Sequence, residues 1–127
     1  MITADQLIAH AVGDYILQSD WMAVHKTSRW APAVLHAALY TVPFFWLRPS
    51  PPGVAIIFGS HLVIDRWNLA RYIAWLSNRM MPAPRLAWAE CRATGHSPER
   101  PLWLTFWLSV IVDNTLHVLI NGWAMRL

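Results

Sequence analysis

Charged residues are scarce in this chain, and the basic ones are scattered. Only 13% of its 127 residues are charged, whereas soluble domains carry roughly 25%. The formal net charge is +3, but the sequence has no basic block, so we expect no nucleic-acid binding. Basic residues beside apolar runs more simply fix membrane topology or contact anionic membrane lipid.

Cysteine is almost absent as well. Cys91 is the single cysteine, which excludes an intrachain disulfide and a cysteine-based zinc motif. The sequence also has no low-complexity tract and no repeat at solenoid periods. Because Asp5, His10 and Asp14 interrupt the first apolar run, we expect that run to stay in the mature protein rather than to act as a signal peptide.

Apolar and aromatic residues, in contrast, are abundant in this sequence. Hydrophobic residues make up 56% of the chain and include nine Trp, a residue that favours the membrane–water boundary. Proline-containing and polar segments separate the apolar stretches. We therefore predict an all-α fold, a polytopic membrane four-helix bundle with a polar His/Asp centre, in one integral membrane domain (1–127). Its predicted spans are residues 2–18, 30–47, 54–76 and 101–125.

Local signals refine these spans. Thr3 and Gln6 predict a capping box at the start of the first helix, and Pro43 predicts a kink or an early end in the second. The third span is predicted as one long helix whose amphipathic second half meets the membrane surface. Within the following loop, residues 84–93 are predicted to form a short interfacial helix anchored by Trp88.

Charge around the spans predicts the orientation. With four spans, loops 19–29 and 77–100 lie on one side of the membrane, and they hold most of the basic residues. The positive-inside rule then makes these loops cytoplasmic and places both termini outside, which we expect to be across a bacterial inner (plasma) membrane. The basic residues of these two loops are Lys26, Arg29, Arg79, Arg85, Arg92 and Arg100.

Histidine and aspartate pairs recur at helical spacing inside the predicted spans. His10/Asp14, His61/Asp65 and Asp113/His117 are each four residues apart, so each pair shares one helix face. Ionisable groups at membrane depth are costly unless they are paired, hydrated or bound to a metal. With His36 they predict one shared centre, whose candidate metal ligands are His10, Asp14, His36, His61, Asp65, Asp113 and His117.

Other polar residues receive supporting or neutral interpretations. Gln18, Tyr40 and Asn114 are predicted to contact the ligands. Lys26 either closes the site or lies at the interface, and the second interpretation is favoured. His25 and His96 are interpreted as solvated loop residues.

The sequence resembles a known family over nearly its whole length. The run HAVGDYILQSDWMAVHK, which begins at His10 and ends at Lys26, resembles the opening motif of domain-of-unknown-function family 3307, a group of small bacterial and phage membrane proteins. That motif has His, then Asp-x-x-x-Gln, then Lys. LHAALY around His36, HLVID at 61–65 and DNTLH at 113–117 are similar as well.

Two positions depart from that family's pattern. Members often have Lys shortly after the third-span Asp, where this chain has Trp67-Asn68. They often have Asp-Gln in the last motif, where this chain has Asp113-Asn114 and so keeps the amide. The resemblance implies no established activity. A looser likeness to small membrane-bound metal-dependent hydrolases with His/Asp motifs is a fold-level analogy.

The donor set points to a divalent metal. Imidazole with carboxylate suits Zn, Mn or Fe, while the lack of thiolate disfavours Cu(I) and iron–sulfur clusters. A metal-bound water could hydrolyse lipid-like substrates, so the leading hypothesis is a membrane-embedded metal-dependent hydrolase. The alternatives are a non-enzymatic phage or bacterial membrane protein of holin or exclusion type, or an ion or proton path through the same groups. Membrane lipid is the expected partner, and a homo-oligomer is possible.

Overall fold

The computed structural model describes residues 2–80 and 85–127. Over these residues it is helical without strands, which confirms the all-α prediction. Two helical segments are long and apolar enough to cross a membrane, Trp30–Leu47 and Leu102–Ala124. Contacts divide the chain into two compact units, the first formed by residues 1–67 with 117–127 and the second by residues 68–116.

The first unit begins with two helices that differ in their hydrogen bonding. Helix α1 (Ala4–Ala11) starts at the predicted capping box, in which the Thr3 hydroxyl accepts from the Gln6 amide N–H and the Gln6 side chain accepts from Thr3 N–H. It continues as a π-helix, η1 (Val12–Ile16). Short π-helical turns are rare and often mark functional sites, and this one contains Asp14.

The next two helices follow a polar turn. Helix α2 (Asp20–His25) is capped by the hydroxyl of Ser19, which accepts from Met22 N–H. Helix α3 (Trp30–Thr41) gives way to the 3-10 helix η2 (Val42–Leu47). Pro43 lies at the start of η2 and cannot donate a backbone hydrogen bond, so the early end predicted there is confirmed.

The third predicted span is not one helix. Helix α4 (Pro51–Trp67) ends before Asn68, whose φ of 47° lies in the left-handed region, and α5 (Ala70–Met80) begins two residues later. Asparagine tolerates this conformation better than most residues. The prediction of a continuous helix through the amphipathic part of this span is therefore wrong, because a backbone turn at Asn68 interrupts it.

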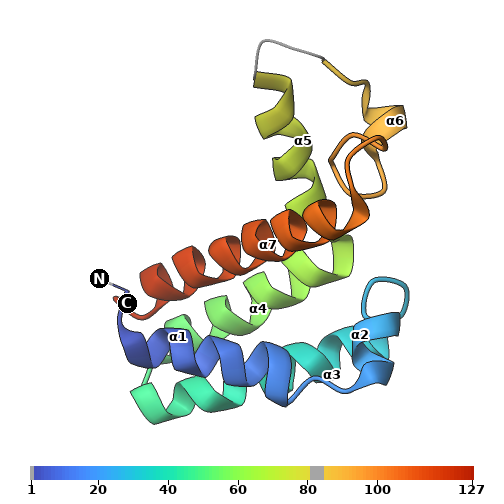
Figure 1. The fold of residues 1–127 in the computed structure, drawn as a ribbon. Helices are drawn as coiled ribbons and strands as arrows, with labels where there is room; N and C mark the ends of the chain where they lie inside the picture. The colour runs from blue at the N-terminus through green and yellow to red at the C-terminus, as the bar shows by residue number, and fades with distance from the viewer. Residues whose placement is uncertain (1, 81–84) are drawn as a thin grey trace. The chain divides into compact units, whose positions relative to one another are not determined.

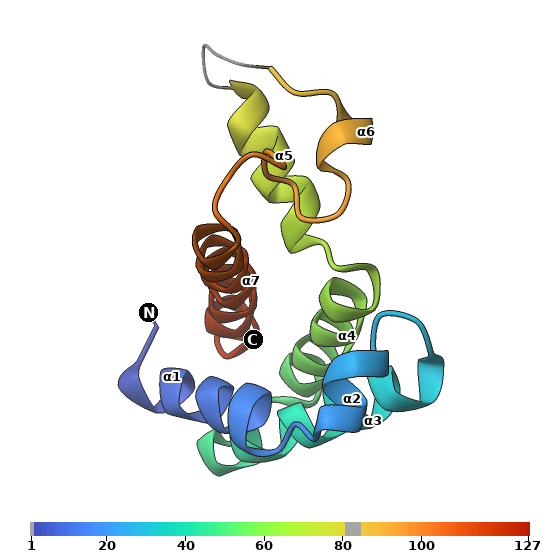
Figure 2. The same cartoon turned by 45° about the vertical axis from the view of Figure 1, so that its right-hand side comes forward.

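Close packing holds the helices of the first unit together. Helix α3 packs against α4, while α1 and η1 lie along α3 and η2 (Figures 1 and 2). Tyr40, Phe44 and Ile57 are fully buried in the core of this unit. A Cβ atom added at Gly13 would lie 2.7 Å from the Tyr40 ring and 2.9 Å from the Tyr40 carbonyl oxygen. Glycine at this position thus permits η1 to lie close against Tyr40 of α3.

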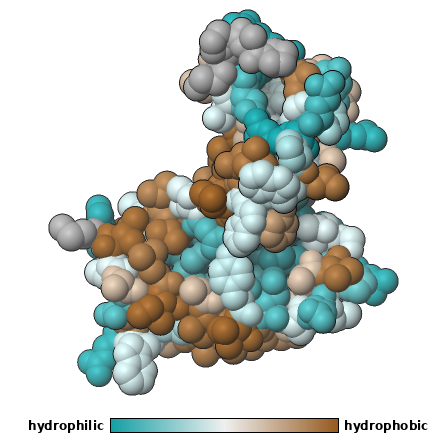
Figure 3. Space-filling view, in the orientation of Figure 1, coloured by the Kyte–Doolittle hydropathy of each residue, from teal (hydrophilic) through white to brown (hydrophobic). Residues whose placement is uncertain are grey.

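Apolar side chains also cover the outside of the first unit. Figure 3 shows hydrophobic residues gathered over the face of this unit that α1 presents. The large apolar side chains that are exposed on the first unit include Ile8 and Ile16 of the α1–η1 segment and Phe45 and Trp46 of η2. Such contiguous apolar exposure is rare on soluble monomers and typical of surfaces that contact a partner or lipid.

The second unit contains α5, α6 (Trp88–Cys91) and the first part of α7 (Leu102–Ala124). The Tyr72 and Trp88 rings stack at 4.7 Å, which joins α6 to α5. The predicted interfacial helix is shorter than expected, since only residues 88–91 are helical, and Pro84 lies outside the described residues. Trp88 packs on α5 here, so its aromatic contact is with protein.

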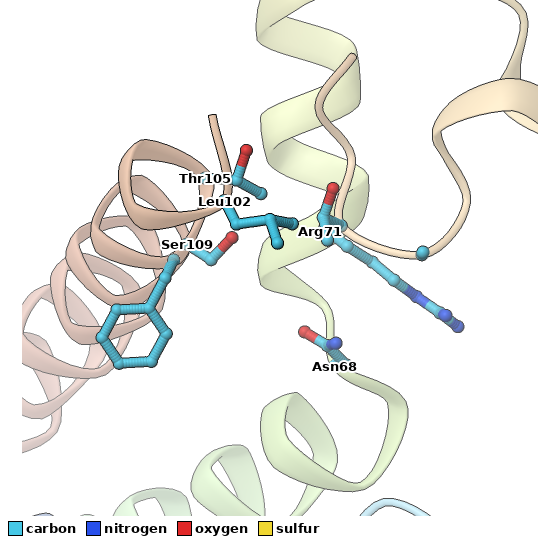
Figure 4. Close-up of a pocket in the computed structure, with 8 residues that line it drawn as sticks. Asn68, Arg71, Leu102, Thr105 and Ser109 are labelled. Carbon is cyan, nitrogen blue, oxygen red and sulfur yellow. The ribbon is translucent and has the colours of Figure 1, made fainter. Parts of the chain in front are cut away.

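Two further features of the second unit bear on the predictions. His96, interpreted as solvated, is instead buried, with its Nδ1 atom 2.9 Å from the Arg100 guanidinium and 3.2 Å from the Asn78 amide. A pocket of about 330 Å³ lies beside Asn68, Thr105 and Ser109 (Figure 4). The Arg71 side chain borders this pocket, but its guanidinium points away and donates to the Arg92 carbonyl oxygen.

Candidate metal centre

Four buried side chains from three segments of the first unit converge on one point. Asp14 comes from η1, His36 from α3, and His61 and Asp65 from adjacent turns of α4. All four are buried, and one potential ligand atom from each lies within 4.8 Å of the others. Buried His/Asp groups arranged in this way could bind a metal ion.

The separations between the ligand atoms are short and similar. Nε2 of His36 and Nε2 of His61 are 3.0 Å apart, and each lies 3.1 Å from Oδ2 of Asp65. Oδ1 of Asp14 lies 3.4 Å from the His36 nitrogen and 3.5 Å from the His61 nitrogen. This Asp14 oxygen is buried and accepts no hydrogen bond from any described residue.

These separations match the edges of a small coordination polyhedron. Ligand atoms at about 2.0–2.1 Å from a tetrahedral ion lie about 3.3–3.4 Å from one another. The five Asp–His and His–His separations are between 3.0 and 3.5 Å. The ligand atoms of Asp14 and Asp65 also lie within 4.8 Å of each other, so the four side chains could hold one cation between them.

A second set of contacts reaches two of these four residues, His61 and Asp65. The Tyr40 ring stacks on the His61 imidazole at 3.5 Å, with the two planes 14° apart. Its hydroxyl is 2.8 Å from Nδ1 of His10 and accepts from the Asn121 amide at 2.6 Å. Nε2 of His117 lies 3.3 Å from Oδ1 of Asp65. Tyr40 thus links three helices around the centre.

Lys26 contacts two residues of the centre directly, Asp65 and His36. Its Nζ donates to Oδ2 of Asp65 at 2.7 Å and to Oε1 of Gln18 at 2.8 Å, and it lies 3.3 Å from Nε2 of His36. These contacts agree with the interpretation in which Lys26 closes the site, and the Gln18 side chain contacts this lysine. No periodic pattern in the sequence predicts that the flexible Lys26 side chain extends from the α2–α3 turn to the centre.

The family comparison matches the part of the chain that builds this centre. The family described as protein of unknown function (DUF3307) matches residues 2–83. The chain belongs to this family. No curated protein and no solved structure matches it. The stretch matched to DUF3307 contains Asp14, His36, His61 and Asp65, together with Lys26.

The remaining predicted residues of the DUF3307 chain fall into two groups. His10 and His117 border the four-residue cluster, with His10 Nδ1 3.6 Å from Oδ2 of Asp14. Asp113 and Asn114 belong to the second unit, and the Asn114 amide donates to the Val110 carbonyl oxygen one turn back along α7. Their part in the centre stays a prediction.

Proposed function

We propose that this DUF3307 protein is an integral membrane protein whose centre binds a divalent metal ion, with Asp14, His36, His61 and Asp65 as its first ligands. The observation that carries the proposal is the set of five Asp–His and His–His separations between 3.0 and 3.5 Å. His10 and His117, which border the cluster, are further candidate ligands for a higher coordination number or a second ion.

Charge at the centre also favours a cation. Asp14 and Asp65 bring two carboxylates into buried positions, and Lys26 contacts only the second of them among the described residues. Leaving a buried carboxylate without a compensating charge costs several kcal/mol. The partners of Asp14 are the imidazoles of His10, His36 and His61, which are charged only when protonated. A divalent ion would supply the compensating charge to Asp14 without that protonation.

The donor set narrows the metal and the chemistry. Two imidazoles with two carboxylates suit Zn, Mn or Fe. Such an ion, when bound, lowers the pKa of a coordinated water and polarises an ester or phosphoryl oxygen. We propose hydrolysis of a lipid-like ester or phosphate as the reaction, because the centre lies among apolar helices that a membrane lipid could approach.

The membrane assignment rests on exposed apolar surface. In Leu102–Ala124 only 11% of the apolar stretch is buried within the chain, whereas a core helix of a soluble protein is mostly buried. Trp30–Leu47 is the second segment with the length and composition of a span. We propose four spans in a bacterial inner membrane, with loops 19–29 and 77–100 in the cytoplasm and lipid as the surrounding partner.

Metal analysis of the detergent-purified protein tests the proposal. We expect about one metal ion per chain in the wild type and a large loss in Asp14→Asn and His61→Gln. His25→Gln is the matched control, since His25 is half-buried outside the four-residue cluster and its imidazole lies 2.9 Å from the Trp21 carbonyl oxygen. Metal content near zero in the wild type, or equal content in all variants, would contradict the proposal.

A non-enzymatic role of the same cluster is the second candidate, and the Lys26–Asp65 ion pair favours it. Nδ1 of His36 and Nδ1 of His61 have no hydrogen-bond partner among the described residues, although metal-binding imidazoles usually donate from this atom. Liposomes separate the roles: product release from labelled phospholipid supports hydrolysis, and pH-driven flux without product supports an ion path. If neither product release nor flux is found, and His61→Gln lowers the stability of the protein, the result supports a structural centre.

A further inference from the structure

We infer that Lys26 and the metal ion compete for Asp65, and that metal binding releases the Lys26 ammonium to bind the phosphate of an anionic lipid. The inference rests on the proposed metal site and adds to it a substrate class and a residue that recognises it. It starts from one shared atom. Oδ2 of Asp65 accepts from Lys26 at 2.7 Å and also lies 3.1 Å from the Nε2 atoms of His36 and His61.

The Lys26 ammonium and the metal ion cannot both bind Oδ2 of Asp65 strongly. A metal ion among the four ligand atoms would use Oδ2 of Asp65 as a donor, and the ammonium bonded to the same oxygen would lie close to the ion. Like charges at such a separation repel strongly where burial lowers the effective dielectric constant. The divalent ion makes four contacts and is held by rigid side chains, so the lysine is the group that moves.

The surroundings of Lys26 allow that movement. Its side chain is 19% exposed, while that of Asp65 is 5% exposed. Lysine has four rotatable bonds in its stem and can turn its ammonium toward water without moving the backbone. The Gln18 side chain, now 2.8 Å from Nζ, offers a second partner as the ammonium withdraws from Asp65.

The rim around Lys26 combines a second cation with exposed aromatic rings. Arg66 follows Asp65 directly, donates to the Thr27 carbonyl oxygen, and places its guanidinium 5.1 Å from the centre of the Trp30 ring. Trp30 packs edge-to-face on Trp67 at 5.8 Å. Trp30 and Trp67 are 55% and 48% exposed. Two basic groups beside exposed tryptophans suit a phosphate attached to an apolar chain.

Metal affinity is the first measurement. Zn²⁺ binding to the full-length protein in detergent is measured by competition with a chromophoric chelator. Because Lys26→Met removes the competing charge, we expect it to bind Zn²⁺ on the order of tenfold more tightly than the wild type. Arg29→Met, which removes an equal charge from an exposed residue of the same loop, is the control and should match the wild type.

Anion affinity is the second measurement, made on the Zn²⁺-loaded protein. We expect Lys26→Met to bind short-chain phosphatidic acid on the order of tenfold more weakly than wild type, and Lys26→Arg to restore binding. Inorganic phosphate, used as a second probe, reports the oxyanion contact alone. If phosphatidic acid binds more tightly than phosphate, the ligand is a lipid. If the two bind equally, the inference that the ligand is a lipid is overturned.

The opposite signs of the two effects separate this role from a structural one. A lysine that only stabilised the fold would not strengthen metal binding when it is removed. Unchanged or weaker Zn²⁺ binding in Lys26→Met overturns the inference but leaves the proposed function standing. Unchanged binding of phosphatidic acid in the same variant does so as well. A wild type that binds no metal overturns the proposed function, and the inference with it. Thermal denaturation in detergent verifies that each variant is folded.

Discussion

At the scale of single residues, Tyr40 contacts three of the polar side chains around the centre. It stacks on His61 and exchanges hydrogen bonds with His10 and Asn121 through one hydroxyl. The Asn121 amide donates to the hydroxyl oxygen, which also lies 2.8 Å from Nδ1 of His10. The aromatic ring and the hydroxyl group thus have separate tasks: the ring positions a candidate ligand, and the hydroxyl satisfies buried polar groups.

Replacing Tyr40 by phenylalanine separates these tasks. Tyr40→Phe keeps the ring on His61 but removes a hydrogen-bond partner from buried His10 and Asn121, which costs about 1–3 kcal/mol of unfolding free energy. We expect thermal stability in detergent to fall while the metal content is retained. Tyr15→Phe, at an exposed position, is the control and should change stability by less than about 0.5 kcal/mol. Loss of metal without loss of stability would show that this division of tasks is wrong.

At the scale of elements, the contact between η1 and α3 sets the position of Asp14. Gly13 precedes Asp14 and leaves no room for a Cβ against Tyr40. Gly13→Ala should therefore push η1 away from α3, lower the unfolding free energy by about 1–3 kcal/mol, and weaken metal binding by displacing the Asp14 carboxylate. Gly59→Ala is the matched control, since a Cβ at Gly59 in α4 meets nothing within 4 Å. Equal behaviour of the two variants would contradict the close-contact argument.

In the second unit, His96 connects the loop before α7 to α5. Its Nδ1 lies within hydrogen-bond distance of the Arg100 and Asn78 donors, an arrangement that requires neutral histidine. Burial, and then the Arg100 charge, lower the pKa of His96 from its usual value of 6.5. The unfolded segment therefore binds a proton more readily than the folded one, and the stabilisation present above pH 6.5 is lost as the pH falls below it.

Hydrogen exchange measures this effect where it occurs. We expect protection of amides in residues 92–100, including Gly95 N–H bonded to the Cys91 carbonyl oxygen, to be lower at about pH 5.5 than at about pH 7.5 after correction for intrinsic rates. His96→Gln should reduce the pH dependence and His25→Gln should leave it unchanged. Protection that rises on acidification would contradict the assigned direction of the pKa shift.

The elements also show what the sequence could and could not predict. The capping box at Thr3 and the end of α3 near Pro43 depend on local chemistry and were predictable. The pairing of His61 with Asp65 was predictable because both lie on one helix face. The turn at Asn68 was not, because an amphipathic pattern continues on both sides of it. The Lys26–Asp65 contact was not either, since it depends on tertiary packing across 39 residues.

At the scale of the whole molecule, the proposed topology can be tested with introduced cysteines in a Cys91→Ala background. Leu127 and Glu99 are both exposed, and the proposal places them on opposite sides of the membrane. In intact spheroplasts, a membrane-impermeant thiol reagent should label Leu127→Cys at once and Glu99→Cys only after permeabilisation. Labelling of both sites from outside, or of Glu99→Cys alone, would contradict the four-span orientation.

X-ray absorption spectroscopy of the Zn²⁺-loaded protein tests the central claim most directly, because it reports the atoms around the ion. The account predicts a first shell of about two nitrogen and two oxygen atoms at about 2.0–2.1 Å, with the outer-shell scattering of two imidazole rings. His36→Gln with His61→Gln should remove that imidazole scattering. A shell of oxygen atoms alone, or an unchanged spectrum in the double variant, would contradict a metal centre built from Asp14, His36, His61 and Asp65.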